Sequence, residues 1–445
     1  MFYHSHEGGA KSLISGWGYM LKKVSHINSL KGTITIPADK SISHRAVMFS
    51  SIAKGECTVN NFSSGADCHS TLNLFKSLGT DIQFIDGKTL KIKSTGILTP
   101  SCDSIYDCGN SGTTMRLVSG ILAGQNFNST LVGDLSLSKR PMKRVIEPLT
   151  LMGANITSEN GHAPLKIIGQ KLQGIDYKSK LASAQVKSCI LLAGLNAEGE
   201  TTFTEPYVSR NHTENLFKYL GADIKINGSE VTLNPSKLYA RDINIVGDIS
   251  SAAFFIVAGL IVPNSDFVIK NVGLNHTRSG IIDVASRMGG NIEILNKTTV
   301  SGEEVGDIRV QYTENLKPCV IEGEDIPRLI DELPVIAVLA SQADGETIIK
   351  DAEDLRNKES DRIKCLVKEL SKIGVEIEEH QDGFIVSGKT KLKGNTELES
   401  YHDHRLAMSY YVAGLICENE IAINGFEWTK ISFPEFEELI KLIQN

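Results

Sequence analysis

The sequence of 445 residues lacks several features that define whole classes of protein. No apolar run is long enough to span a bilayer, which argues against a membrane protein. No two of the eight cysteines form a C-x-x-C pair, which argues against a zinc knuckle or a disulfide framework. The Gly-rich stretch from Asp107 to Arg116 lacks both the G-x-G-x-x-G and the G-x-x-x-x-G-K-[ST] pattern, so it is not one of the common nucleotide-binding motifs.

The chain also lacks an excess of positive charge, because its formal net charge is −7. This sign disfavours nucleic acid or an anionic membrane as a partner, and no aromatic platform for single strands is present. Any phosphate site must therefore be built locally. Hydrophobic residues make up 41% and charged residues 22%, over a length typical of two or more domains. The scattered cysteines favour reduced thiols, so we expect a cytoplasmic protein.

Residues 1–19 differ from the rest of the chain. They are rich in Gly, Ser and His and sustain neither an amphipathic nor a strand pattern. They also lack the basic segment and apolar segment of a secretory signal. Met20 is a candidate natural start. We therefore expect residues 1–19 to be a disordered leader or an added extension outside the fold.

One phrase recurs five times: an amphipathic helix, an apolar residue, a glycine, two further residues and an isoleucine. The glycines are Gly79, Gly153, Gly221, Gly289 and Gly374. A glycine just past a helix takes the left-handed conformation, and a β-branched strand follows each one. The spacing is too long for a solenoid and suits domains made of several α/β units. A break near Val246, where Asp248 or Ser250 can cap a helix over 252–260, divides the chain into two similar halves.

Six or more helix starts carry clusters of Ser, Thr, Lys, Arg or Asp. The first cluster runs from Asp39 to Arg45, after a short strand that Pro37 closes, and it opens a helix over 43–52. A helix N-terminus already offers unpaired N–H groups and a positive dipole end, so cations added there indicate an anion site. A solvated, charged loop is the alternative.

Similar clusters precede predicted helices over 115–123, 189–195, 215–220, 335–340 and 406–415. Arg140 precedes a proline, which keeps its backbone extended and suits it to clamp a carboxylate or phosphate. Asp331 is a candidate base, with helix capping as the alternative. Lys358, Glu359 and Arg362 can share one helical turn, as they also would in a surface ion-pair lattice. If the units stack with parallel helices, these starts converge on a cleft for a polyanionic ligand.

Together these stretches resemble the 5-enolpyruvylshikimate-3-phosphate (EPSP) synthase family of enolpyruvyl transferases, from about Lys22 to the C-terminus. The matching motifs occur in the family's order. They are Asp39-Lys40-Ser41 with Ser43-His44-Arg45, Gly109-Asn110-Ser111-Gly112-Thr113, Lys139-Arg140-Pro141-Met142, Glu359-Ser360-Asp361-Arg362 and Asp403-His404-Arg405. The stretch Ser183-Ala184-Gln185-Val186-Lys187-Ser188 resembles the class II branch.

The resemblance implies an α/β fold of two domains, each made of three βαβαββ units whose helix N-termini face an interdomain cleft. Residues 20–37 and 248–445 would form domain one, and residues 38–247 would form domain two. The chain would cross between the domains twice, near Pro37 and near Val246. We expect a monomer.

The implied reaction transfers the enolpyruvyl group of phosphoenolpyruvate to the 5-hydroxyl of shikimate 3-phosphate and releases phosphate. The resemblance implies no cofactor and no metal. The residues that would hold shikimate 3-phosphate are Lys40, Ser41, Arg45, Ser183, Gln185, Arg210, Asp331 and Lys358. The residues that would contact phosphoenolpyruvate are Lys40, Gly112, Arg140, Gln185, Arg362 and Arg405. The motifs add Asn110, Ala184 and His404 to the substrate-binding set.

The same resemblance assigns the proton transfers, with Lys40 as the third catalytic residue. Asp331 resembles the group that accepts the proton of the 5-hydroxyl, and Glu359 the group that donates a proton to the methylene carbon. For Glu359 this role requires a pKa raised by burial. Glyphosate, the family's inhibitor, is expected to compete with phosphoenolpyruvate near Gly112.

One position departs from the family pattern. Many members carry a lysine close before a Ser/Thr-Phe-Pro phrase near the C-terminus, where this chain has Ile431, and Lys430 is one position off. Lys358 would supply that charge instead.

Two other hypotheses stay open at this point. A UDP-N-acetylglucosamine enolpyruvyl transferase would have the same fold, but that branch carries Lys-Asn where this chain has Lys40-Ser41, and a reactive loop cysteine that nothing near 135–140 matches. A non-catalytic anion-binding protein of the same fold would have lost a charged partner, whereas Lys40, Asp331 and Glu359 are all present.

Overall fold

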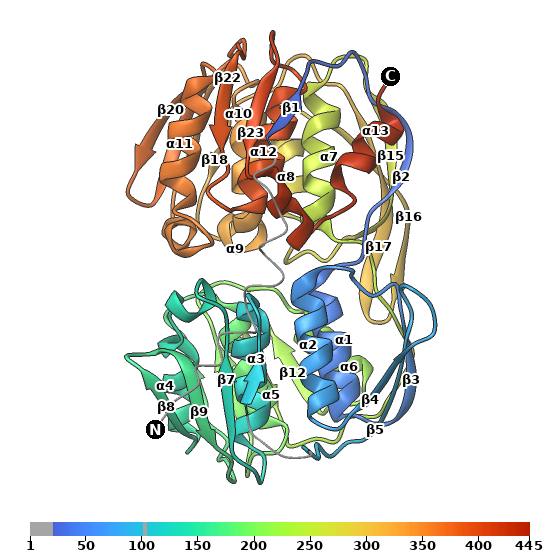
Figure 1. Ribbon diagram of the computed structural model, residues 1–445, viewed down its shortest axis with the longest axis vertical. Coiled ribbons are helices and arrows are strands. Elements are labelled where there is room, and N and C mark those ends of the chain that lie inside the picture. The colour runs from blue at the N-terminus through green and yellow to red at the C-terminus, as the bar shows by residue number, and fades with distance from the viewer. Residues whose placement is uncertain (1–20, 101–104) are drawn as a thin grey trace, which may run out of the picture.

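The computed structural model describes residues 21–100 and 105–445 as two stacked halves, each with three small sheets around buried helices (Figure 1). The expected leader, residues 1–19, lies outside the described residues. Within those residues, no helix combines the length and the apolar character that a membrane crossing needs. All six sheets follow one plan, in which two parallel strands are followed by two antiparallel ones; one sheet lacks the last strand.

The lower half of Figure 1 contains three four-stranded sheets. In pairing order these are β14 (Ile243–Asn244), β3 (Lys54–Asn60), β5 (Leu90–Thr95) and β4 (Asp81–Phe84); β6 (Ile105–Asp107), β7 (Ser129–Val132), β9 (His162–Ile168) and β8 (Asn155–Glu159); and β10 (Asp176–Lys178), β11 (Thr201–Thr204), β13 (Glu230–Leu233) and β12 (Ile224–Asn227). Its helices are α1 (Lys40–Ile52), α2 (Ala66–Ser77), α3 (Gly112–Ala123), α4 (Lys143–Leu151), α5 (Ala184–Gly194), α6 (His212–Tyr219) and the 3-10 turn η1 (Leu137–Lys139).

The upper half repeats this plan with strands from both ends of the chain. Its sheets, in pairing order, are β16 (Asn291–Val300), β17 (Glu303–Gln311), β15 (Asp266–Gly273) and β2 (Lys31–Thr35); β18 (Val320–Ile321), β19 (Gly345–Ile349), β21 (Gly383–Gly388) and β20 (Glu376–His380); and β1 (Lys22–Val24), β23 (Ile421–Asn424) and β22 (Thr396–Glu399). Its helices are α7 (Ile249–Ile261), α8 (Gly280–Arg287), α9 (Asp325–Leu329), α10 (Leu333–Ala340), α11 (Arg362–Lys372), α12 (His404–Gly414) and α13 (Phe436–Ile443), with 3-10 turns η2 (Ile330–Glu332), η3 (Glu353–Asn357) and η4 (Phe426–Ile431).

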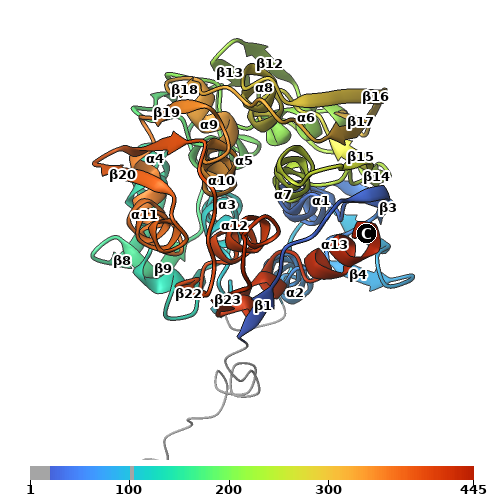
Figure 2. The same ribbon diagram turned by 90° about the horizontal axis from the view of Figure 1, so that it is seen from above.

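Each half has its own hydrophobic core around three central helices. In the upper half α7, α10 and α12 pack on one another, and Figure 2 shows them at the centre with the sheets around them. Every residue of α7 and of α10 is buried, which explains why both are apolar on all sides. The lower core is built on α1, α3 and α5 in the same way. Its buried residues come from 38–246 plus one residue of β17, whereas those of the upper core come from 24–36 and 249–443.

The five recurring glycines behave as the repeat predicts. Each follows a helix, precedes a strand and has a positive φ, between 81° and 94°. This conformation carries no steric cost at glycine, so the helix can end and the chain can turn at once into the strand. The prediction of a repeated helix–glycine–strand unit is confirmed.

The chain passes between the halves at two adjacent points. The backbone N–H of Asp39 donates to the Val246 carbonyl at 2.8 Å, and that of Asp248 donates to the Pro37 carbonyl at 2.9 Å. These bonds bring the starts of α1 and α7 side by side, one from each half.

The hairpin of β16 and β17 adds a third connection. It reaches down from the upper half (Figure 1). The hydroxyl of Ser301, at its tip, accepts the N–H of Asn244 in the lower half at 2.9 Å. The two halves are therefore joined along one edge of the molecule.

Candidate active site

The polar helix starts picked out in the sequence gather between the two halves. The helices begin two to five residues earlier than their apolar runs predict: α1 starts at Lys40, α3 at Gly112 and α5 at Ala184. The apolar run marks the packed part of each helix, whereas the first turn is polar because it reaches the space between the halves. The motif residues consequently lie in the first turns themselves, where N–H groups have no helical partner.

Lys40 occupies the first position of α1. Asp39 caps this helix by accepting the Ile42 N–H at 2.8 Å, and the Lys40 side chain forms an ion pair with Asp67 of α2. Burial lowers the pKa of Lys40, but Asp67 outweighs it and the pKa is raised, so the side chain stays a cation. Asp67 gave no signal in the sequence, because its role depends entirely on where α2 packs.

Arg45 lies one helical turn further along α1 and is buried. Its guanidinium donates to the Thr213 hydroxyl at 2.8 Å, to the Ser188 hydroxyl at 2.8 Å and to the Ser41 carbonyl at 3.0 Å. Burial lowers its pKa to about 10, still well above neutrality. Arg45 thus ties α1 to α5 and α6, while Ser41 stands between it and the space between the halves.

The Gly-rich turn before α3 lies against Arg140. The Asn110 side-chain carbonyl accepts from Arg140 at 2.8 Å, and a Cβ added to Gly112 would lie 3.5 Å from the Arg140 Nη1. The backbone of Arg140 is extended, as its place before a proline predicts. Asn110, Gly112 and Arg140 therefore form one group at the start of α3.

Gln185 joins this group from the start of α5. Its amide nitrogen donates to the Thr113 hydroxyl at 3.1 Å, and its oxygen accepts from Arg116 at 2.6 Å. Ser183 and Ala184 stand beside it at the half-buried start of the helix, where the Ser183 hydroxyl makes no capping bond. Sequence reasoning missed Arg116, although its position four residues after Gly112, on the same helix face, could have indicated it.

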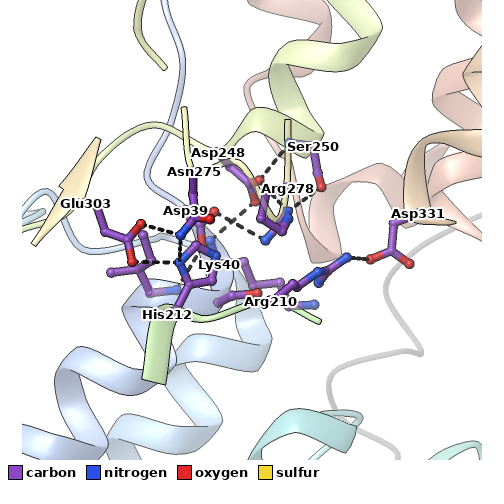
Figure 3. Close-up of polar contacts among 12 residues, drawn as sticks. Asp39, Lys40, Arg210, His212, Asp248, Ser250, Asn275, Arg278, Glu303 and Asp331 are labelled. Atoms are coloured by element: carbon purple, nitrogen blue, oxygen red, sulfur yellow. Dashed lines mark hydrogen bonds and ion pairs between the residues drawn. The ribbon is translucent and has the colours of Figure 1, made fainter. Parts of the chain in front are cut away.

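Asp331 is the carboxylate on which cations from both halves converge. Arg210, just before α6 in the lower half, pairs with one of its oxygens (Figure 3). Lys358 lies 3.4 Å from the other oxygen. Arg405 donates to its backbone carbonyl at 3.2 Å. Burial raises the pKa of Asp331, but Lys358 and the arginines hold it well below its usual range. The capping alternative is wrong, because Glu332 occupies the N-cap position of α10.

Glu359 departs from expectation. Its carboxylate accepts from Arg362 at 2.7 Å. Burial raises its pKa, yet Arg362, His404 and Arg140 outweigh this effect and hold the pKa below its usual range. The expectation of a raised pKa is therefore wrong for this arrangement of the protein.

Arg362 and Asp403 form a buried ion pair beneath Asp331 and Glu359. The Arg362 Nε donates to Asp403 Oδ2 at 2.8 Å, and the side chain of Arg362 is only 2% exposed. Asp403 also caps α12 by accepting the Arg405 N–H at 2.9 Å. His404, the first residue of α12, is buried, which lowers its pKa to about 4. A solvent-exposed ion-pair lattice at this place is ruled out, because Arg362 is buried.

Comparison with known proteins finds relatives over most of the chain. Residues 24–440 match the model of the family EPSP synthase (3-phosphoshikimate 1-carboxyvinyltransferase). A 3-phosphoshikimate 1-carboxyvinyltransferase of Thermoanaerobacter sp. (strain X514) is 53% identical, over 92% of this chain and 96% of its own length. One of Thermodesulfovibrio yellowstonii is 51% identical, over 96% of this chain and 100% of its own.

Solved structures extend the comparison to the fold. EPSP synthase from Acinetobacter baumannii is 41% identical and superposes with a TM-score of 0.86, covering 96% of this chain and 98% of that one. The enolpyruvyl transferase NikO from Streptomyces tendae shares the fold at 17% identity, with a TM-score of 0.78 and the same coverage. The chain belongs to the EPSP synthase family.

Proposed function

We propose how the gathered residues carry out the reaction of this family: transfer of the enolpyruvyl group of phosphoenolpyruvate to shikimate 3-phosphate, in the shikimate pathway of aromatic amino acid biosynthesis. The products are 5-O-(1-carboxyvinyl)-3-phosphoshikimate and phosphate. The observation that carries the assignment is the convergence of cations from both halves on Asp331, next to Glu359. Two polyanionic substrates need such a concentration of positive charge, and two carboxylates within it can move protons.

The cations divide into two groups by their position. Arg140, Arg362 and Arg405, with Lys40, would bind the carboxylate and phosphate of phosphoenolpyruvate beside Gly112. Ser41, Ser183 and Gln185 would bind shikimate 3-phosphate from the lower half, with Arg210 and Lys358 beside Asp331. Arg45 would act from behind, by fixing the carbonyl of Ser41.

Asp331 would accept the proton of the 5-hydroxyl of shikimate 3-phosphate. At the same time the hydroxyl oxygen would form a bond to the central carbon of phosphoenolpyruvate. The depressed pKa of Asp331 supports this role, because the group is ionised at neutral pH and available to accept a proton. The surrounding cations would stabilise the negative charge of the tetrahedral intermediate. Loss of phosphate from this intermediate, with a proton from the new methyl group, completes the transfer.

Glu359 would give its proton to the methylene carbon, for which its pKa has to rise. The anionic groups of phosphoenolpyruvate supply the reason. When they pair with Arg362 and Arg140, they neutralise the same cations that depress the pKa of Glu359. We infer that substrate binding raises the pKa of Glu359, so that the carboxylate takes up a proton.

We further propose that residues 20–37 with 248–445, and residues 38–247, move as two domains that close on the substrates. A monomer in the cytoplasm is the arrangement we expect, because one chain supplies cations and carboxylates from both halves. Lys358 would replace the lysine that other members carry near Ile431, a role supported by its distance of 3.4 Å from Asp331.

The test is phosphate release from phosphoenolpyruvate, measured with shikimate 3-phosphate, with UDP-N-acetylglucosamine and with neither. Release that requires shikimate 3-phosphate supports the proposal. Release only with UDP-N-acetylglucosamine would move the protein to the other transferase branch. If folded protein released no phosphate with either acceptor, a non-catalytic anion-binding role would remain.

A further inference from the structure

Arg278 is a buried arginine that the roles proposed above do not use. It lies in the loop between β15 and α8, and it is 2% exposed. Figure 3 shows its guanidinium between the side chains of Asp39 and Asp248, at the edge where the chain crosses between the halves. Nothing in the sequence distinguished it, because no helix start or recurring phrase contains it.

Arg278 joins the capping residues of two helices from opposite halves. Its Nη1 lies 3.6 Å from Asp39, which caps α1, and its Nη2 lies 3.3 Å from Asp248, which caps α7. Asp248 also accepts the backbone N–H of Lys40 at 3.4 Å. One guanidinium therefore sets the distance between the two helix starts, and with it the position of Lys40.

The same guanidinium reaches toward Asp331 through a short chain of contacts. Its Nη2 donates to the Ser250 hydroxyl at 2.5 Å, and that hydroxyl donates to Glu332. Glu332 in turn lies 3.6 Å from Arg405, which donates to the Asp331 carbonyl at 3.2 Å. The contacts run without a gap from the crossing to the proposed proton acceptor.

The charges explain why such a residue belongs there. Asp39, Asp248 and Glu332 are all buried, and three buried carboxylates require a compensating cation. Removing one partner of a buried ion pair leaves an uncompensated charge, whereas the intact pair adds little net stability over an apolar core. A buried arginine at this place is therefore better explained by orientation than by stability.

We propose that Arg278 is a positioning residue, which holds the starts of α1, α7 and α10 in register so that Lys40, Asp331 and Arg405 face the substrates together. The inference rests on the proposed function. It assigns no contact with substrate to Arg278. Its effect on catalysis runs through Asp248 and through the bridge of Ser250 and Glu332.

The first test compares Arg278→Lys with the wild type and with Arg309→Lys as a matched control. Arg309 makes two hydrogen bonds to Asp266 at 2.9 and 2.8 Å in the same half, but it is partly exposed and remote from the crossing. Lysine keeps the charge but cannot hold Ser250 and Asp39 with one planar group. All proteins are assayed below the onset of thermal unfolding, with both substrates varied.

We expect kcat of Arg278→Lys to fall by about 10- to 100-fold, as a displacement of catalytic groups by about 1 Å produces. Both KM values should change much less than kcat, and the control should match the wild type. Equal kcat in Arg278→Lys and wild type would overturn the proposal. So would a loss confined to KM, because that would indicate loosened substrate binding.

A second variant tests the bridge and keeps every buried charged side chain, although Glu332 loses the hydroxyl that donates to it. Ser250→Ala removes the link between Arg278 and Glu332 and leaves Asp39, Asp248 and Arg278 in place. We expect it to lower kcat, and we expect the double variant with Arg278→Lys to be no worse than Arg278→Lys alone. Multiplicative effects, or a normal kcat in Ser250→Ala, would contradict the proposal. Absence of phosphate release in the wild type would instead overturn the proposed function, and this inference with it.

Discussion

The two edges of the interface between the halves are built differently. At the crossing edge the charged groups are buried: the Arg278 and Asp39 side chains are each 3% exposed. Away from the crossing edge, on the side that we call the open edge, the pairs between the halves are more exposed: Arg210 and Asp331 are 21% and 16% exposed, and Arg144 and Asp354, 3.5 Å apart, are 32% and 46% exposed. Figure 1 places α4 and α11 at this open edge, away from the crossing.

Glu303 is the centre of a second buried group at the crossing edge. It begins β17 in the upper half and lies 2.8 Å from the His212 Nδ1 of α6 in the lower half. It also accepts from Asn275 at 2.8 Å and from Asn215 at 3.2 Å. His212 stands two residues after Arg210, so this group anchors the segment that reaches Asp331 (Figure 3).

The contrast suggests a division of labour. Buried contacts with several hydrogen bonds are costly to break, so the crossing edge holds the halves together. Exposed ion pairs are worth little, so the cations of the open edge can exchange a protein carboxylate for a substrate anion. Changes at the open edge should therefore affect activity, whereas changes at the crossing edge should affect stability or, at Arg278, the positions of the catalytic groups.

The largest effect expected from this division is on chemistry, at Glu359. Glu359→Gln keeps the shape but has no proton to give, so kcat should fall by about 10²- to 10⁴-fold with an unchanged thermal midpoint. Phosphate release dependent on shikimate 3-phosphate measures kcat. Asp354→Asn, which alters another carboxylate of the open edge, is the control and should stay within about threefold of wild type. A Glu359→Gln enzyme with normal turnover would refute the assignment.

Next in size is a loss of stability at Glu303. Glu303→Gln should lower the free energy of unfolding by about 1–3 kcal/mol, because the buried His212 loses its charged partner. Urea denaturation of wild type and variant measures this difference. Turnover per folded molecule should stay close to normal. If the variant were as stable as the wild type, the buried contacts of the crossing edge would contribute no more stability than those of the open edge, and the proposed difference between the edges would be wrong.

The same position predicts a pH dependence of stability. Burial raises the pKa of Glu303, but His212 and the amide donors outweigh it, so the folded-state pKa is lowered. A depressed carboxyl pKa contributes stability above the unfolded-state value of about 4.3, and that contribution disappears as the pH falls through the folded-state pKa. The stability difference between wild type and Glu303→Gln should therefore be constant near neutrality and shrink below about pH 4.3. A difference that grows with acidity would have the wrong sign.

A smaller effect is expected at Arg210, in the open edge. Arg210→Gln should raise KM for shikimate 3-phosphate by about tenfold, the effect of losing one charge-assisted contact. Stability should change by less than about 0.5 kcal/mol, because the pair with Asp331 is partly exposed. Steady-state kinetics and urea denaturation test the two statements. Arg144→Gln, which removes the arginine that pairs with Asp354 at the open edge, serves as the comparison and should leave that KM closer to normal.

The smallest effect is expected at Gly112. A Cβ there would lie 3.1 Å from Arg116 and 3.5 Å from Arg140. Gly112→Ala should raise KM for phosphoenolpyruvate and the inhibition constant of glyphosate together, each by about threefold or more, because the methyl group takes space beside Gly112, where both ligands would bind, and crowds Arg116. Gly87→Ala, where an added Cβ meets no atom within 4 Å, is the control. Wild-type activity that glyphosate leaves unchanged up to millimolar concentrations would contradict competition at this site.

Sequence patterns predicted local structure well. The extended backbone of Arg140, the capping of α7 by Asp248 and the left-handed glycines follow from the φ/ψ preferences of a few neighbouring residues. The helix starts were predicted too late by two to five residues, because apolar periodicity detects only the packed part of a helix. The motifs nevertheless identified residues that lie between the halves, although they missed Asp67, Arg116 and Arg278.

The electrostatic properties of those residues came from tertiary structure. The pKa of Glu359 depends on Arg140, and the charge state of Lys40 on Asp67, both from other segments of the chain. Arg45 ties helices together behind the cleft because α5 and α6 happen to pack there.

The sequence by itself determined the repeated units, the family and the polar helix starts, since these depend on short-range preferences and residue order. Only the tertiary structure decided which carboxylate meets which cation, how deeply each pair is buried, and that Arg278 connects the crossing to Asp331. The physical reason is that a charge interacts through space. Its energy depends on distance and burial, and both are set by segments that lie far apart in the chain.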